Sequence, residues 1–146
     1  MAGVVFGKLP AHGDFVSRGL RAEERDALDA WLSAAMVTAR AAWGEAFADR
    51  YDQALPLRCD GSGVSGALAA SQDGVGRRYP LLALSGAGEG ERSEALLYEA
   101  IAEAWTADRL ADALTPPSGA VERWLRDDGP IVLGQAPADL LVEMLR

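Results

Sequence analysis

Cysteine and histidine are almost absent from this sequence of 146 residues, which contains only Cys59 and His12 of these two types. One cysteine cannot form an internal disulfide, and it fits a reducing compartment. A single thiol and a single imidazole leave no Cys/His cluster for zinc, and the scattered carboxylates lack the spacing of a calcium loop. We therefore expect no metal and no other cofactor, and we expect Cys59 to be a small buried side chain.

Long apolar runs and excess positive charge are missing as well. No run approaches the ~18 residues of a membrane-spanning helix, and the N-terminus lacks the basic and apolar regions of a signal peptide. The 14 Lys and Arg residues are outnumbered by 22 Asp and Glu, so the formal net charge is −8 at pH 7. This balance argues against nucleic acid or an anionic membrane as the partner. We expect a cytoplasmic protein without stable membrane insertion.

The length of the chain suits one domain with its own hydrophobic core. The sequence contains no internal repeat and no low-complexity linker, so we expect a single domain over residues 1–146. Nothing in the sequence indicates an oligomeric state, although the amphipathic segment 137–145 could dock into a larger assembly.

Short apolar or alternating segments predict a sheet. Residues 56–60 and 64–70 flank the turn Gly61-Ser62-Gly63, which indicates a β-hairpin. This hairpin favours antiparallel pairing, while the helices between other strands leave room for one parallel neighbour. The strands are expected at residues 3–7, 56–60, 64–70, 79–85 and 130–134, with a turn at Asp128 before the last one.

Apolar residues at steps of three and four predict helices on both sides of that hairpin. The longest pattern runs from Leu28 to Trp43 and should end near Gly44. Later helices are expected at residues 94–105, capped by Ser93, and at 108–114, 118–125 and 137–145. Strands and helices together indicate an α/β fold of the α+β type, with a largely antiparallel central sheet flanked by helices. A longin-like or profilin-like arrangement would suit this order.

Glycine, proline and polar residues gather in a first loop at residues 7–19. Their density predicts a backbone that turns sharply and forms neither helix nor strand. The loop holds His12, Asp14 and Ser17, but residues so close together in one loop cannot readily assemble a Ser-His-Asp triad. We assign no catalytic residue, and a small hydrolase or phosphatase-like enzyme centred on His12 and Asp14 remains the alternative hypothesis.

A second glycine-rich loop covers residues 71–78. Its sequence Gly74-Val75-Gly76-Arg77-Arg78 lacks the third glycine of a dinucleotide-binding motif and the Gly-Lys-Ser/Thr ending of a P-loop. It therefore gives little support to a phosphate-binding site. Because both loops bracket predicted strands, they could lie at one end of the sheet.

Two motifs, one in each loop, resemble those of a known family. They read FGKLPAHGDFV at residues 6–16 and SQDGVGRRYPL at residues 71–81, and LDAWL at residues 28–32 matches the helix between them. On these motifs the sequence resembles the TagF family of type VI secretion accessory proteins. His12 stands where the family often has arginine, which argues against a catalytic histidine, and Ala70 stands where proline is common.

The resemblance implies a protein that is not an enzyme. It points to a cytoplasmic post-translational repressor or modulator of type VI secretion that acts by binding the forkhead-associated (Fha) scaffold protein or other secretion components. Some family members carry a fused phosphatase domain of the PppA type. Here we expect a stand-alone TagF-like domain without it.

The candidate site residues all belong to the two loops. Phe15 could be an apolar anchor and the charged residues could supply polar contacts to a partner. The other interpretation is that the same residues only define turns, with the carboxylate of Asp14 or Asp73 accepting bonds from loop amides. The partner-binding or loop-defining residues are Lys8, Pro10, His12, Gly13, Asp14, Phe15, Arg18, Asp73, Gly76 and Arg77.

Overall fold

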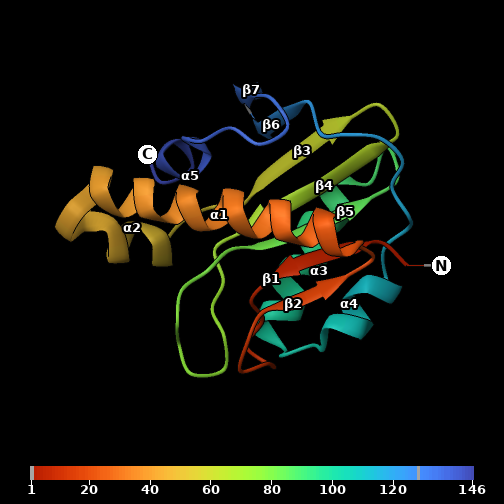
Figure 1. Ribbon diagram of the computed structural model, residues 1–146, viewed down its shortest axis with the longest axis horizontal. Helices are drawn as coiled ribbons and strands as arrows, with labels where there is room; N and C mark the ends of the chain where they lie inside the picture. The colour runs from red at the N-terminus through yellow and green to blue at the C-terminus, as the bar shows by residue number, and fades with distance from the viewer. Residues whose placement is uncertain (1, 128) are drawn as a thin grey trace.

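Seven strands form one sheet in this protein. The structure, a computed structural model, describes residues 2–127 and 129–146. The strands are β1 (Val4–Gly7), β2 (Val16–Arg18), β3 (Leu57–Gly61), β4 (Val64–Ala69), β5 (Leu81–Ser85), β6 (Arg123–Arg126) and β7 (Gly129–Leu133). Their order across the sheet is β2-β1-β5-β4-β3-β6-β7, and all neighbouring pairs are antiparallel (Figure 1). The antiparallel sheet is therefore confirmed, and the described strands include no parallel pair.

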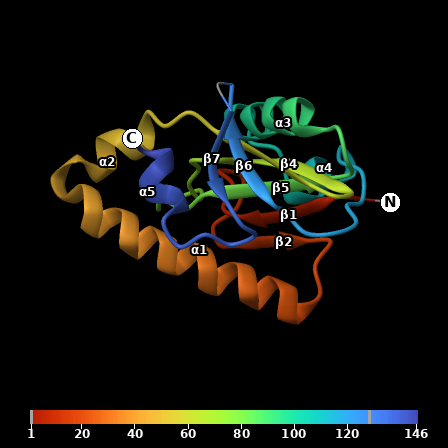
Figure 2. The same cartoon turned by 90° about the horizontal axis from the view of Figure 1, so that it is seen from above.

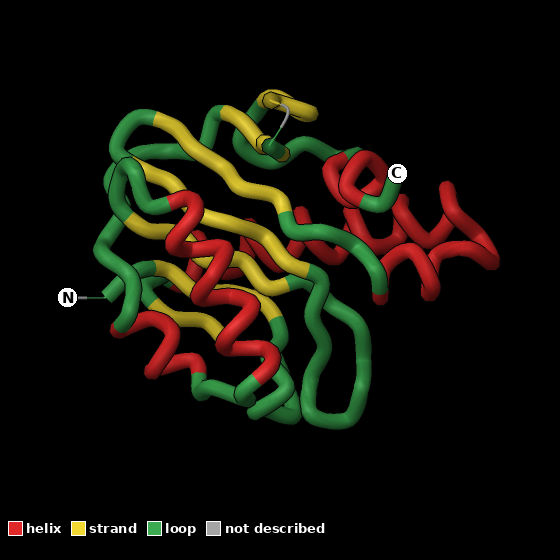
Figure 3. The backbone as a smooth tube through the Cα atoms, turned by 180° about the vertical axis from the view of Figure 1, so that it is seen from behind, coloured by secondary structure: helices red, strands yellow, loops and turns green. Residues whose placement is uncertain are grey.

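Helices cover both faces of this sheet, which confirms the α+β fold. One face carries α1 (Ala22–Trp43), α2 (Phe47–Asp52) and α5 (Leu140–Met144), and the other carries α3 (Gly90–Ala102) and α4 (Ala107–Asp112). Figure 2 shows the resulting layers edge-on, and Figure 3 shows α3 and α4 lying across the strands. The likeness to longin or profilin folds stays a prediction.

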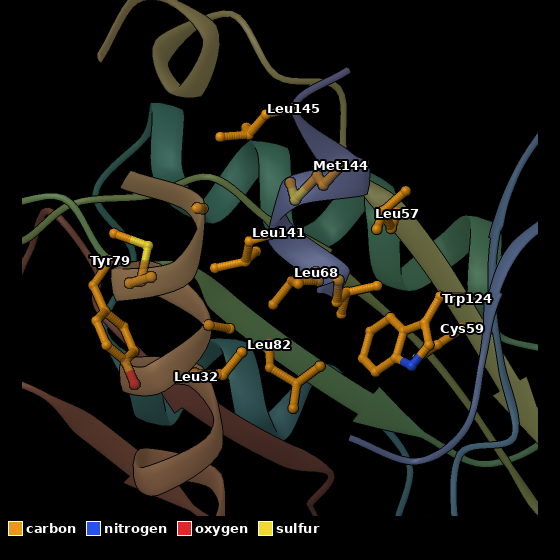
Figure 4. Close-up of a cluster of buried hydrophobic side chains, with 14 of the residues drawn as sticks. Leu32, Leu57, Cys59, Leu68, Tyr79, Leu82, Trp124, Leu141, Met144 and Leu145 are labelled. Carbon is orange, nitrogen blue, oxygen red and sulfur yellow. The ribbon is translucent and has the colours of Figure 1, made fainter. Parts of the chain in front are cut away.

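Alternation along the strands explains why both faces are covered. In β5, Leu81 and Ala83 pack in the cluster under α3 and α4, whereas Leu82 packs in the cluster under α1. Successive side chains of a strand point to opposite faces, so a continuous apolar strand requires a helix layer on each side. Figure 4 shows the cluster on the α1 side, in which Leu82 lies near Leu32 and Leu141 reaches in from α5.

The long helix α1 begins and ends with identifiable caps. Its first turn lacks a Ser, Thr, Asp or Asn cap, and the side chain of Glu24 instead accepts a bond from the backbone amide of Arg21 at 2.8 Å. At the other end Gly44 adopts a φ of +54°, a conformation that favours glycine, and α1 stops there as predicted.

The helix predicted at residues 118–125 is wrong, because this segment contributes β6. The amides of Ser118 and Glu122 donate to the carbonyls of Gly63 and Asp60, both at 2.8 Å, so the chain runs along β3 before it pairs with it. Trp124 then points into the core on the α1 side. Pairing with the free edge of β3 therefore stabilised this segment as a strand more than its short helical pattern stabilised a helix.

Smaller predictions also need correction. The loop predicted at residues 7–19 is interrupted by a strand, because residues 16–18 form β2, with Val16 buried against the α4 side of the sheet. Ser93 is not a cap, since α3 begins at Gly90 and buries Ser93 inside the helix. The helix predicted at residues 137–145 is shorter in the structure, where α5 covers Leu140–Met144. The turn predicted at Asp128 lies outside the described residues.

Candidate functional site: two loops joined at one end of the sheet

Strand pairing brings the two glycine-rich loops together. In the antiparallel β1–β5 pair Gly7 lies opposite Leu81, so the loop that follows β1 and the loop that precedes β5 leave the sheet at the same end. Gly7 has a φ of +131°, and a Cβ atom there would lie 2.0 Å from the Pro80 carbonyl oxygen. Only glycine allows the two backbones to approach this closely. In Figure 1 the loop between β4 and β5 projects from this end beside the loop between β1 and β2.

The carboxylate of Asp73 is the hub of both loops. Its side chain has no exposed surface. Oδ1 accepts the backbone amides of Val75 and Arg77, each at 3.0 Å, and Oδ2 accepts Lys8 Nζ at 3.1 Å and Arg77 Nε at 2.7 Å. Burial alone would raise the pKa of this carboxyl, but the bonds from the two amides, Lys8 and Arg77 together hold the pKa well below its usual range. Asp73 therefore stays ionised.

Further hydrogen bonds cross from one loop to the other. The amide of Gly74 donates to the His12 carbonyl at 2.7 Å, and Arg77 Nη2 donates to the Gly13 carbonyl at 2.8 Å. The hydroxyl of Ser71 donates to the Lys8 carbonyl at 2.7 Å. With the buried Lys8–Asp73 pair, these bonds join the loops into one body.

Helices on both faces of the sheet hold this body in place. On the α2 side, the Tyr51 hydroxyl donates to the Ser71 carbonyl at 2.8 Å and accepts the Ser71 amide at 3.0 Å. Burial raises the pKa of this phenol, so it keeps its proton. On the α4 side, the Ala107 amide donates to His12 Nε2 at 3.1 Å, and Arg18 pairs with Asp108 at 2.5 Å. The loops are thus fixed between two helices.

Phe15 lies on top of the joined loops and remains 46% exposed. Its ring meets Tyr79 edge-on, with centroids 4.7 Å apart, and Lys8 Nζ lies 4.7 Å from its centroid. Tyr79 in turn bonds through its hydroxyl to Ser33 of α1 at 3.2 Å, and burial raises the pKa of Tyr79 to about 12. Phe15 therefore has a fixed base and an open outer face.

The predicted site residues divide by exposure. Lys8 and Asp73 are buried in the hub, and Pro10, His12 and Arg18 are half-buried. The solvent-exposed members are Gly13, Asp14, Phe15, Gly76 and Arg77. Among the described residues, the Asp14 side chain has one hydrogen bond, which it accepts from the neighbouring Phe15 amide at 2.7 Å. We call Gly13, Asp14, Phe15, Val75 and Arg77 the loop-pair surface.

Sequence reasoning missed three residues that complete this arrangement. Val75 is 74% exposed at the tip of the second loop, and its place between two glycines was a signal that could have found it. Tyr79 follows the loop directly, and its aromatic ring could have suggested a base for Phe15. Tyr51 comes from α2, and no local pattern links it to Ser71.

The side chain of His12 serves as a hydrogen-bond acceptor between the first loop and α4. Nε2 of His12 accepts the Ala107 amide, so in the tautomer that this bond requires Nδ1 carries the proton. The described part of the chain contains no group of three His, Cys, Asp or Glu residues placed to hold a metal ion. Within the same residues, no helix combines the length and the apolar character needed to cross a bilayer.

The sequence profile of the TagF N-terminal domain, described as type VI secretion system-associated, matches residues 4–126. The chain belongs to the TagF family. Both loops of the candidate site lie within the matched TagF region, whereas β7 and α5 lie beyond it. No curated protein matches the sequence significantly.

A solved structure is similar to this one over nearly the whole chain. The crystal structure of PA0076 from Pseudomonas aeruginosa PAO1 is similar to this structure, with a TM-score of 0.67 and 25% sequence identity. The similarity covers 99% of this chain and 76% of that chain. The segment that holds β7 and α5 is therefore part of the shared fold.

Proposed function

We propose that this protein is a non-enzymatic, cytoplasmic accessory protein of the type VI secretion system. It represses or modulates secretion post-translationally by binding a secretion component, with an Fha-type scaffold as the first candidate. Residues 1–146 act as a single TagF-like domain, and the loop-pair surface is the contact. Membership of a type VI secretion-associated family supports the setting of this function.

One observation carries the binding role: two apolar side chains are exposed on loops that are otherwise fixed by buried polar bonds. Phe15 is 46% and Val75 is 74% exposed, and both sit on the body held by Asp73. Loops fixed before binding lose little conformational entropy when a partner docks. The side chain of Arg77, on the same joined loops, is 61% exposed, and aromatic and arginine side chains are typical of binding hot spots.

The contacts of His12 favour this proposal over a hydrolase. A general base needs a free lone pair on an imidazole nitrogen, and the lone pair on Nε2 already accepts the Ala107 amide. Among the described residues, His12 has no carboxylate hydrogen-bond partner that could orient it. The His12 side chain therefore serves to connect the first loop to α4.

A binding panel of purified components tests the proposal. The components of one secretion system, the Fha scaffold among them, are immobilised and probed with wild-type chain and Val75→Asp. We expect one component to capture the wild type, and capture by Val75→Asp to be at least ~10-fold weaker, because a charge would be buried at the contact. Leu133→Asp is the matched control, since Leu133 is 71% exposed on β7 at the far edge of the sheet. If no component binds the wild type, or if both variants bind alike, the proposal fails.

A further inference from the structure

A hollow of about 430 Å³ lies between α2 and the end of α5. Figure 1 and Figure 2 both place the C-terminal end of the chain next to α2. The hollow is lined by residues of α2, of the link between α2 and β3, of the end of β6, and of the end of α5 with the two residues that follow it. Those that matter here are Arg50, Leu55, Arg126, Met144, Leu145 and Arg146.

The charge of this hollow is opposite to that of the chain. Three arginines and one acidic residue, Asp49, are among the residues that line it, whereas the protein as a whole carries a formal charge of −8. Arg146 is paired with Glu143 at 2.8 Å, so Arg50 and Arg126 provide most of the uncompensated charge. A local positive site on an acidic protein favours an anionic group from outside.

Arg50 and Arg126 are held in position before any ligand arrives. The Arg50 guanidinium lies 4.2 Å from the Trp43 ring centroid and donates from Nη1 to the Leu145 carbonyl at 3.1 Å. Arg126 donates from Nη2 to the Met144 carbonyl. These bonds cap the last carbonyls of α5 and use only part of the five donors that each guanidinium has.

One donor of Arg126 has no hydrogen-bond partner among the described residues. This donor is Nε, which is buried. A buried charged donor without an acceptor is costly, and native structures rarely retain one without a reason. Because Nε is enclosed, an incoming carboxylate would pair instead with the Nη donors of Arg126 that the bond to Met144 leaves free, and it would offset the charge around Nε.

Apolar surface at the mouth narrows the choice of ligand. Leu55 is 66% exposed between this hollow and a second one of about 340 Å³, which is also lined by Tyr98. A free inorganic anion would gain nothing from Leu55 or Tyr98. A protein segment with an apolar side chain beside an acidic one would use both features.

We propose that this hollow is a second binding site, which receives a Glu or Asp side chain of a partner protein and seats the neighbouring apolar side chain on Leu55. It is separate from the loop-pair surface, and it does not depend on the function proposed for that surface. Arg50 and Arg126 bind the carboxylate, and Leu55 selects for the apolar neighbour.

The test is a titration followed by NMR of the ¹⁵N-labelled full chain. The probes are acetyl-Leu-Glu-amide, its glutamine analogue acetyl-Leu-Gln-amide, and inorganic phosphate. We expect saturable shifts of the Arg126 Nε–Hε and Leu55 amide signals with the glutamate peptide, and at least ~10-fold weaker binding of the glutamine analogue, which lacks the charge-assisted bonds. The Nε–Hε signal of Arg92, which is paired with Glu89 on α3, should not move.

Variants separate the site from a general charge effect. Arg126→Gln should abolish the shifts, and Leu55→Ser should weaken the glutamate peptide while leaving the α5 cap intact, so the test survives if Arg126→Gln unfolds. Equal binding of the glutamine analogue, absence of saturable shifts at Leu55, or phosphate binding as tight as that of the peptide would overturn the assignment to a protein segment.

Discussion

At the scale of single residues, Asp73 determines how the two loops are held. It is buried, it accepts four hydrogen bonds, and it reaches the lone lysine of the chain, Lys8. The sequence suggested both loops as a site, and one of its two interpretations had the Asp73 carboxylate accepting bonds from loop amides. It could not show that Lys8 would be buried as the partner of Asp73, because the two residues lie 65 positions apart and only the β1–β5 register brings them together.

The Asp73 network predicts a specific dependence of stability on pH. Because the folded-state pKa of Asp73 is lowered, its stabilising contribution is complete above the unfolded-state pKa of about 3.9 and is lost as the pH falls toward the lower folded-state value. Between about pH 5 and pH 2, the free energy of unfolding of the wild type should therefore fall more steeply than that of Asp73→Asn. Urea denaturation at several pH values measures both slopes.

The control for this experiment is Glu45→Gln, an exposed carboxylate next to Gly44. Its slope should match that of the wild type. Parallel slopes for the wild type and Asp73→Asn would mean that Asp73 is not ionised and bonded in the folded protein as described.

His12 gives a second prediction, which concerns structure instead of catalysis. His12→Ala should lower the free energy of unfolding by about 1–3 kcal/mol, because the amide of the fully buried Ala107 loses its acceptor. His12→Gln should recover part of that loss, since its side-chain oxygen can accept the same bond. Urea denaturation compares the three proteins, and equal stability of His12→Ala and the wild type would refute the role given to His12.

At the scale of secondary structure, local patterns located most elements and misassigned those whose conformation depends on distant neighbours. The period of α1, the alternation of β3 and the turn Gly61-Ser62-Gly63 before β4 needed no outside partner to be recognised. By contrast, Trp124 and Leu125 fit a helical turn as well as a strand, and the free edge of β3 decided for β6. Val16 likewise became a strand residue because β1 offered an edge beside it.

Helix α5 lies outside the matched family region, yet it contributes to the hydrophobic core. Its apolar side chains do not form an exposed docking face, because Leu140, Leu141 and Met144 are buried in the core cluster on the α1 side. Figure 4 shows Leu141 and Met144 within this cluster. Two tryptophans of α1 bond to this segment, Trp31 to the Pro137 carbonyl at 2.9 Å and Trp43 to the Val142 carbonyl at 3.2 Å. The last segment is therefore an integral part of the core.

Leu141→Ala tests the contribution of α5. Leu141 is 1% exposed, so its truncation leaves a cavity and should lower the free energy of unfolding by about 2–5 kcal/mol. Urea denaturation followed by tryptophan fluorescence provides the measurement, because Trp31 and Trp43 report on α5 directly. A loss below about 1 kcal/mol would show that α5 is not docked in solution.

At the scale of the whole molecule, an antiparallel sheet with helices on both faces positions two loops at one end and an arginine-lined hollow near α2. Helix α2 lies between these regions: Tyr51 holds the second loop, and Arg50 lines the hollow. Sequence motifs could indicate the loops and the family. The hollow could not be predicted, because Arg50, Arg126 and Arg146 come from segments far apart in the sequence and carry no shared motif.

The most direct test of the central claim is the affinity of Phe15→Ser for the secretion component that the panel identifies, measured by isothermal titration calorimetry. Phe15 is the aromatic side chain of the loop-pair surface, and removing a hot-spot aromatic typically costs about 2 kcal/mol or more, which is roughly a 30-fold rise in Kd. We predict that rise for Phe15→Ser, with a moderate fall in melting temperature because the packed half of the ring is lost, and an unchanged Kd for Leu133→Ser; both titrations are run well below the lower melting temperature. A Kd for Phe15→Ser within about twofold of the wild-type value would contradict the claim that this surface makes the contact.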